Sequence, residues 1–213
     1  MSNYRSMIKD IVGQTLDPAL RTAGFNRTEN LWFRGEGDCA HVIEIQGGKY
    51  NIPGREEDFT INLGFWIPRL WHLRWGENPP AKPHASRYFP SLRLKEIVPD
   101  NVEIGTTWWR LRSEDDNGNR RTVEQVSHLI TEQCLPFLEQ YNEINDVMGL
   151  IDEDRGRCVY PAQKLYAAIL AHLCGHINTR DQLINDVKMM KSQAWQEQAT
   201  IVEERLLEGL CHN

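Results

Sequence analysis

The sequence predicts an α+β fold: an antiparallel sheet of about four strands flanked by helices, with a helical C-terminal third. Two observations lead to this prediction. Apolar residues alternate with polar or small residues over DFTINLGFWI (58–67), which is the period of a strand with one buried face. From Thr122 onwards the apolar positions instead recur every three or four residues, which is the period of an amphipathic helix.

Three further segments are predicted to complete the sheet. LWFR (31–34) and AHVIEIQ (40–46) are the expected partners of 58–67, and TTWWRLR (106–112) is the last strand. The short link GEGD between the first two is of hairpin length, so these strands should run antiparallel.

Helices are predicted before this sheet. Residues 3–16 carry an apolar stripe, which indicates an amphipathic helix. Asp17 then looks like an N-cap with Pro18 at the first helical position, so a second short helix is expected to end before Gly24.

Helices are also predicted after it. Thr122 with Gln125 forms a capping box, and Pro136 should kink that helix or end it. A further helix should begin at Pro161, and the last is expected to start at Thr179 and run to about residue 210.

Length and composition place the chain in a broad class. Its 213 residues suit one α+β domain over 1–145 and a helical extension over 146–213 that packs on the same domain. A net charge of -6 disfavours binding of the whole chain to nucleic acid or to an anionic membrane. Five cysteines without a CxxC pair, and no apolar run of about 18 residues, predict a cytoplasmic protein with reduced thiols.

The segment 68–104 departs from regular patterning. It holds six prolines, which prevent long helices or strands, together with several aromatic residues that a disordered linker would lack. We therefore expect an ordered excursion that packs on the sheet.

This excursion carries the strongest functional signal. Residues 68–95 have a local charge of +5, and tryptophan and arginine are the residue types that dominate protein-binding hot spots. The same types stack on bases and bind phosphates in single-stranded nucleic-acid sites, and tryptophans can equally complete a core under a proline-rich loop. The candidate partner-binding residues are Trp66, Arg69, Trp71, Arg74, Trp75, Arg87 and Tyr88.

An enzymatic alternative rests on the sheet itself. Glu44 and Gln46 on one strand could share a face with Thr60 and Asn62 on the next, and a carboxylate beside amides can act as a general base or bind a substrate. The competing interpretation is a solvated sheet face. A cleft lined by Glu44, Asn62 and Arg110 would favour a hydrolase or a nucleic-acid-processing enzyme.

No cofactor or metal site is predicted. His172 and His176 are four residues apart and could face one metal ion, but no further ligands occur at suitable spacing, and a helix end explains both. The sequence contains no GxSxG, P-loop or GxGxxG motif.

Five short motifs occur in a set order along the first two thirds of the chain. They are Leu20…Gly24-Phe25, Trp32-Phe33-Arg34, Val42-Ile43-Glu44-Ile45-Gln46, Phe59-Thr60-Ile61-Asn62-Leu63-Gly64 and Trp108-Trp109. This order resembles a bacterial family known as domain of unknown function 4304, over roughly residues 10–140. The resemblance implies an α+β fold and a bacterial or phage origin. It implies no activity, and it associates the chain with small proteins found among immunity or defence genes.

Together these observations favour a non-catalytic protein-binding module, an immunity-like or defence-associated factor that engages an acidic protein partner. Nucleic acid is the alternative ligand, and no membrane association is expected. Replacing Trp71 and Arg74 with alanine should weaken partner binding without unfolding the chain if they form an interface, whereas loss of the fold would indicate a core role. The sequence does not indicate an oligomeric state.

Overall fold

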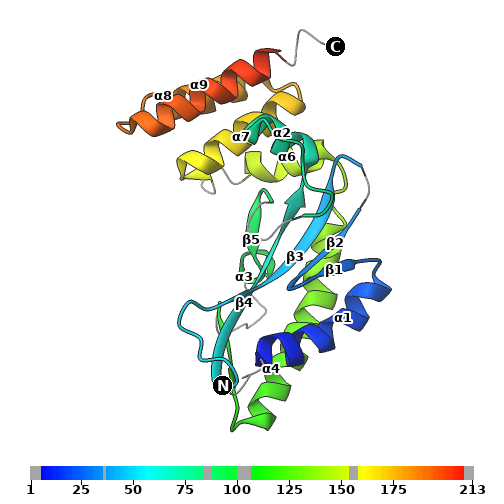
Figure 1. Ribbon diagram of the computed structural model, residues 1–213. Coiled ribbons are helices and arrows are strands. Elements are labelled where there is room, and N and C mark those ends of the chain that lie inside the picture. The colour runs from blue at the N-terminus through cyan, green and yellow to red at the C-terminus, as the bar shows by residue number, and fades with distance from the viewer. Residues whose placement is uncertain (1–5, 36, 84–87, 100–106, 154–157, 209–213) are drawn as a thin grey trace.

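A computed structural model describes residues 6–35, 37–83, 88–99, 107–153 and 158–208 (Figure 1). It confirms the α+β fold, with an antiparallel sheet and several C-terminal helices. Within the described ranges, no helix combines the length and apolar character needed to cross a membrane.

The sheet has six strands rather than about four. The strands run in the order β1-β2-β3-β4, and the far edge of β4 pairs with β6 along 56–59 and with β5 along 62–64. The two strands that the sequence did not predict, β1 and β5, are only three residues long, too short to show a period of two. The strands are β1 (Asn26–Thr28), β2 (Leu31–Arg34), β3 (Ala40–Gly47), β4 (Glu56–Trp66), β5 (Ser91–Arg93) and β6 (Trp109–Arg112).

Helices form the N-terminal segment and most of the chain after β6. Figure 1 shows α7, α8 and α9 beyond one end of the sheet, next to α2, whereas α1 and α4 lie towards the other end. The helices are η1 (a π-helix, Ile8–Val12), α1 (Gly13–Thr22), α2 (Pro68–Trp75), α3 (Leu94–Ile97), α4 (Asp116–Leu129), η2 (a π-helix, Ile130–Cys134), α5 (Leu135–Leu138), α6 (Ile144–Glu153), α7 (Pro161–Leu173), α8 (Ile177–Lys188) and α9 (Gln193–Glu208).

The prediction of a helix boundary at Asp17-Pro18 was wrong. The helix that starts with η1 continues to Thr22 with Pro18 inside it. Asp17 does not act as the N-cap of a new helix, because its carboxylate accepts hydrogen bonds from Trp32 Nε1 at 2.9 Å and from Arg21 Nε at 2.6 Å. The π-helical turn just before α1 is a type of local irregularity that accompanies breaks in the regular hydrogen-bond ladder.

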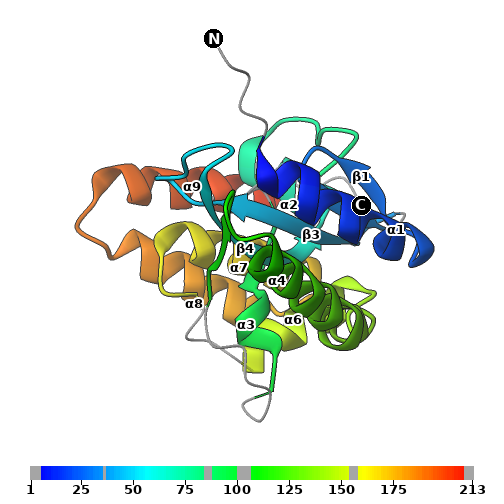
Figure 2. The same ribbon diagram turned by 90° about the horizontal axis from the view of Figure 1, so that it is seen from below.

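Two further helix predictions were also wrong. α4 begins at Asp116 rather than Thr122, because the Asp115 carboxylate caps it by accepting from the Gly118 N–H at 2.8 Å. The final helix is two helices, α8 and α9, which Figure 2 shows as separate segments joined by a turn. Ser192, a residue type suited to an N-cap, directly precedes α9.

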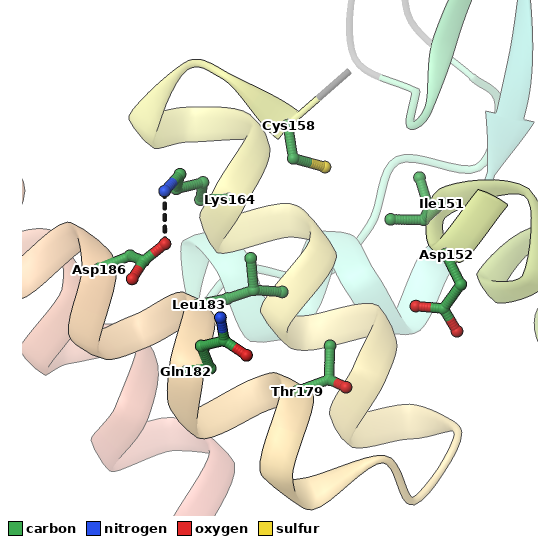
Figure 3. A pocket seen from close by; sticks show the side chains of 8 residues that line it. All are labelled: Ile151, Asp152, Cys158, Lys164, Thr179, Gln182, Leu183 and Asp186. Atoms are coloured by element: carbon green, nitrogen blue, oxygen red, sulfur yellow. Dashed lines mark hydrogen bonds and ion pairs between the residues drawn. The ribbon is translucent and has the colours of Figure 1, made fainter. Parts of the chain in front are cut away.

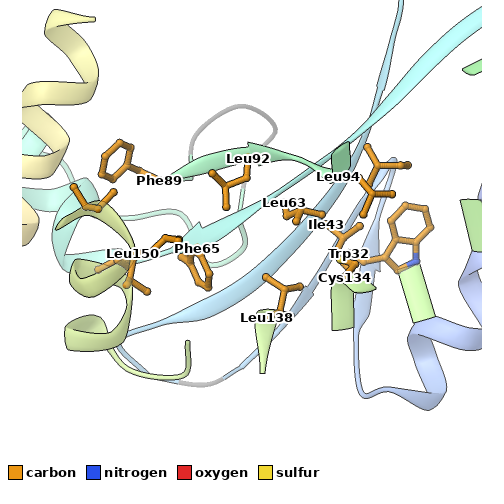
Figure 4. Close-up of a cluster of buried hydrophobic side chains, with 14 of the residues drawn as sticks. Trp32, Ile43, Leu63, Phe65, Phe89, Leu92, Leu94, Cys134, Leu138 and Leu150 are labelled. Atoms are coloured by element: carbon orange, nitrogen blue, oxygen red, sulfur yellow. The ribbon is translucent and has the colours of Figure 1, made fainter. Parts of the chain in front are cut away.

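The sheet separates two hydrophobic clusters of different size. On the larger side, Phe59, Ile61, Leu63 and Phe65 of β4 are fully buried, as their alternation predicted. Figure 4 shows part of this major core, which extends without interruption into α7 and α9. On the opposite face a smaller cluster, the minor core, consists of Leu31, Ala40, Val42, Trp66, Trp71 and Tyr88.

The described residues of the excursion 68–104 include aromatic side chains that pack on the sheet, as expected from its composition. Its described parts contain α2, β5 and α3, and β5 is hydrogen-bonded to β4. Trp71 and Tyr88 from this segment cover the minor-core face of the sheet.

Candidate functional site

The local sequence explains why α2 forms and ends where it does. Pro68 occupies the first helical position, where its missing N–H has no intrahelical partner to lose. Gly76 ends the helix with φ +74°, and its N–H donates to the His72 carbonyl at 2.7 Å. The helix follows directly from the end of β4, so its position is set by the central strand.

The inward side of α2 completes the minor core. Trp71 is 6% exposed and lies 5.5 Å, centroid to centroid, from Trp66, which is 5% exposed. Tyr88 covers the same face of the sheet and is also buried. These three aromatic side chains therefore pack inside the protein.

Arg74 joins α2 to the C-terminal helices. Its side chain is 4% exposed, and Nη1 donates to Gln198 Oε1 of α9 at 2.8 Å. The guanidinium also lies over the rings of Trp75 and Tyr166, and burial lowers its pKa, with the positive charge of Arg205 acting in the same direction. Arg205 of α9 in turn donates to the Arg74 carbonyl at 2.8 Å. The two arginines thus bond α2 and α9 in both directions.

We expect Arg74→Ala to lower the free energy of unfolding by about 2 kcal/mol, because it removes a buried charged hydrogen bond and two ring contacts. Urea denaturation measures this change. Arg69→Ala, on the exposed side of the same helix, is the control and should change stability by less than about 0.5 kcal/mol. Equal stability of the two variants would mean that Arg74 does not hold the helices together.

The outward side of α2 remains open to solvent. Trp75 is 42% exposed and Arg69 is exposed. Two apolar residues of α9, Ile201 and Leu207, are likewise exposed, and α2 packs against α9. We call the two exposed residues Arg69 and Trp75 the α2 surface.

Basic groups from two further helices lie close to this surface. Arg180 Nη1 of α8 is 3.3 Å from His172 Nδ1 of α7. The pKa of His172 is lowered by burial and by the positive charges of Arg180 and Arg69. Because Arg180 is partly neutralised by Asp181 at 2.6 Å, Arg69 contributes the exposed positive charge at this position.

The structure divides the seven predicted partner-binding residues. Trp66, Trp71, Arg74 and Tyr88 are buried, Arg69 and Trp75 are at the surface, and Arg87 lies outside the described residues. Partner binding by these residues stays a prediction, and the ones that solvent reaches are Arg69 and Trp75. Sequence reasoning did not find Gln198, Arg205 and Arg180, since no local pattern links α8 or α9 to a helix more than a hundred residues earlier.

The predicted polar row does lie on one face of the sheet. Glu44 pairs with Asn62 and Gln46 pairs with Thr60 across β3 and β4. Asn62 Nδ2 donates to Gln46 Oε1 at 2.8 Å, and Thr60 Oγ1 donates to the Thr107 carbonyl at 2.8 Å. These side chains therefore bond to one another and to a backbone carbonyl, so this face of the sheet is not uniformly solvated.

Within this row Glu44 is buried and Arg110 is engaged elsewhere. Glu44 is 7% exposed and accepts a hydrogen bond from the Tyr88 hydroxyl at 2.6 Å. Burial and the Glu44 charge raise the pKa of Tyr88, so its hydroxyl stays protonated. Arg110 instead pairs with Asp58 at 2.7 Å and with Glu56 at 3.1 Å. The cavity beside Glu44 is therefore lined by neither Asn62 nor Arg110 among the described residues.

A separate cavity of about 140 Å³ lies between α6, α7 and α8 (Figure 3). Lys164 and Asp186 in its wall form an ion pair at 2.5 Å, and Asp152 of α6 is 3.9 Å from His176 Nδ1. Its charged side chains are thus matched by oppositely charged or ionisable neighbours. Over the described ranges, no group of three or more His, Cys, Asp or Glu side chains is placed to hold a metal ion.

The comparison with known families decides the relationship suggested by the sequence motifs. A family model described as "Domain of unknown function (DUF4304)" matches residues 16–140. The chain belongs to the DUF4304 family. No curated protein and no solved structure matches it. The DUF4304 region includes α2 and the whole sheet, whereas α7 and α9, which pack against α2, lie beyond it.

Proposed function

We propose that this DUF4304 protein is a non-catalytic protein-binding module of the cytoplasm, an immunity-like or defence-associated factor that engages an acidic protein through the α2 surface. The observation that carries the proposal is that Trp75 is 42% exposed and lies on the same short helix as exposed Arg69. Tryptophan and arginine are the residues most often found at binding hot spots.

The rigidity of α2 supports this role. Arg74 and Arg205 bond the helix to α9, and Trp71 packs it onto the sheet. A surface that is already ordered loses little conformational entropy on binding, which favours affinity. Trp75 is therefore presented to a partner in a fixed position.

The charge of the surface supports an acidic partner. Arg69 is exposed, and its positive charge is strong enough at this position to help lower the pKa of His172. Complementary charge raises the association rate and fixes the orientation of the two proteins. Since the whole chain has a net charge of -6, this potential is local and favours a protein surface over the extended backbone of a nucleic acid.

The test is capture of a partner from native lysate, with and without nuclease, by tagged wild-type and variant chains. We expect a stoichiometric protein that survives nuclease treatment and is lost with the double variant Trp75→Ala, Arg69→Ala. With the purified partner, Trp75→Ala alone should weaken the affinity about 30-fold, as expected for a hot-spot residue.

The chain offers a matched control for this experiment. Lys49 lies 5.5 Å from the ring of Tyr50, which is 85% exposed, so this pair also combines a basic side chain with an exposed aromatic ring. It lies in the β3–β4 loop, at the opposite end of β4 from α2. Lys49→Ala with Tyr50→Ala should leave binding unchanged. Retention of the partner by the α2 variant, or release by nuclease, would contradict the proposal.

The enzymatic alternative has one observation in its favour, the buried Glu44 carboxylate beside a cavity. A second titrating group is needed for acid–base catalysis, and the adjacent Tyr88 is held protonated. A substrate screen in which turnover disappears in Glu44→Gln would support this alternative over the binding module.

A further inference from the structure

A cavity of about 240 Å³ opens beside Glu44, at the end of the β1–β2 hairpin. This volume holds several water-sized groups, so it is larger than a single hydration site. The described residues that line it come from β1, the hairpin turn, β2, β3 and the excursion, and they are Thr28, Glu29, Asn30, Leu31, Glu44, Ile45 and Pro83.

The lining is rich in hydrogen-bond acceptors and holds negative charge. Glu29 and Glu44 supply two carboxylates, Thr28 and Asn30 add neutral oxygens, and none of the described lining residues is basic. Arg27, which neighbours Glu29, is paired with Asp17 at 3.8 Å, so the carboxylates of the lining favour a ligand that brings positive charge and several N–H donors.

The Glu44 carboxylate is held in place and has capacity to spare. Its backbone lies in the middle of the sheet, paired with Leu31 on one side and Asn62 on the other. Tyr88 is its one side-chain donor in the described part of the chain, whereas a carboxylate accepts about four hydrogen bonds. A side chain that is 7% exposed gains little from bulk water, so donors inside the cavity would stabilise its charge.

The rim of the cavity has an unusual backbone conformation. Glu29 has φ +53°, a region that residues with a Cβ rarely adopt. It is kept there by hydrogen bonds around the turn: Arg27 Nε donates to the Glu29 carbonyl at 2.8 Å, and the Ile45 N–H donates to the Asn30 carbonyl at 2.8 Å. Strained residues of this kind persist where the surrounding structure holds them, and they are frequent at binding sites.

We propose that this cavity binds an ammonium or guanidinium group, with Glu44 as the buried anchor and Glu29 at the rim. Such a group could belong to a small amine or to a lysine or arginine side chain of another protein, and both would place N–H donors against the Glu44 carboxylate. This inference does not depend on the α2 surface, because the cavity and that surface share no residues.

The test uses n-butylguanidinium and n-butylammonium as probes, with neutral n-butylurea as the matched control. Amide shifts in two-dimensional NMR are followed during titration of the full chain. We expect saturable shifts at Asn30 and Ile45 with the two cations and none with butylurea. A short peptide with a central arginine then distinguishes a protein side chain from a small amine, with a glutamine peptide as the neutral control. Tighter binding of the arginine peptide than of butylguanidinium points to a protein side chain.

Variants test the role of each carboxylate. Glu44→Gln keeps the shape of the side chain and should weaken cation binding at least tenfold, while Glu204→Gln on exposed α9 should leave it unchanged. Glu29→Gln, in the exposed turn, gives a second test that does not disturb the sheet and should weaken binding about threefold. Equal binding of butylurea, or full affinity in a folded variant of either carboxylate, would overturn the proposal.

Discussion

Replacing Glu57 with alanine is expected to lower the free energy of unfolding by about 3 to 5 kcal/mol, because it removes a buried carboxylate that several donors share. Glu57 is 2% exposed. Its carboxylate accepts from Ser6 Oγ at 2.6 Å, from the Met7 N–H at 2.8 Å and from the Gly54 N–H at 2.9 Å. The side chain thus caps the N-terminal helix and fastens it to β4.

Urea denaturation of wild type and variant measures this effect. Glu56→Ala is the matched control, because Glu56 is a neighbouring carboxylate whose partners Arg110 and Arg112 are exposed. Exposed ion pairs contribute little, so its loss should cost less than about 1 kcal/mol. A cost for Glu57→Ala as small as that of Glu56→Ala would show that the N-terminal helix is not held through this carboxylate.

The Glu57 carboxylate also predicts that the free energy of unfolding depends on pH. Burial raises the pKa of Glu57, but the hydrogen bonds from Ser6, Gly54, Met7 and Ile8 lower it by more, so the net pKa is below the ordinary value of 4.5. The folded state therefore favours the ionised form. The stabilisation is present above pH 4.5 and is lost as the pH falls through the lowered pKa, so the stability difference between wild type and Glu57→Gln should narrow in that range.

The sheet could be predicted from sequence because its central strand carries an unambiguous period. Four apolar residues of β4 alternate onto the major core, and the polar row on the other face follows from the same alternation. The start of α4 was missed although Asp115 is an N-cap residue, because residues 113–121 are all polar or glycine and show no apolar period. The Asn119 side chain accepts from the Arg112 N–H at 2.9 Å and donates to the Arg112 carbonyl at 2.7 Å, which bonds the first turns of α4 to the end of β6.

In the candidate site, sequence alone could not decide which residues are buried. Tryptophan and arginine in the excursion indicated either a core or an interface, and composition could not assign each residue to one of them. Arg74 is internal because Gln198 accepts its hydrogen bond from 124 residues away, whereas Arg69, one turn earlier on α2, is exposed. The burial of Arg74 is therefore decided by where α9 docks.

The position of α9 also bears on the family. The DUF4304 match ends at residue 140, and the described helices that pack against α2, α7 and α9, come later. In this chain the C-terminal helices thus cover part of a surface that belongs to the DUF4304 region and leave Arg69 and Trp75 uncovered. On the proposed function, these added helices define which part of α2 a partner can reach.

Gly64→Ala is expected to lower the free energy of unfolding by about 3 kcal/mol or more, although alanine is normally better than glycine in a strand. Gly64 lies on β4 on the minor-core face, directly beneath Tyr88. An added Cβ would lie 2.8 Å from Tyr88 Cε2 and closer still to Tyr88 Cδ2 and to the Pro90 carbonyl oxygen. Since one of these neighbours is backbone, a change of rotamer cannot relieve the clash.

Urea denaturation again gives the stability change, and Gly149→Ala is the control. A Cβ at Gly149, inside α6, meets no heavy atom within 4 Å, so this substitution should stabilise the protein by about 1 kcal/mol through helix propensity alone. Opposite signs for the two glycines are the expected result. If Gly64→Ala is tolerated, Tyr88 does not lie on the sheet as described, and the hydrogen bond that positions Glu44 for a cationic ligand would be lost with it.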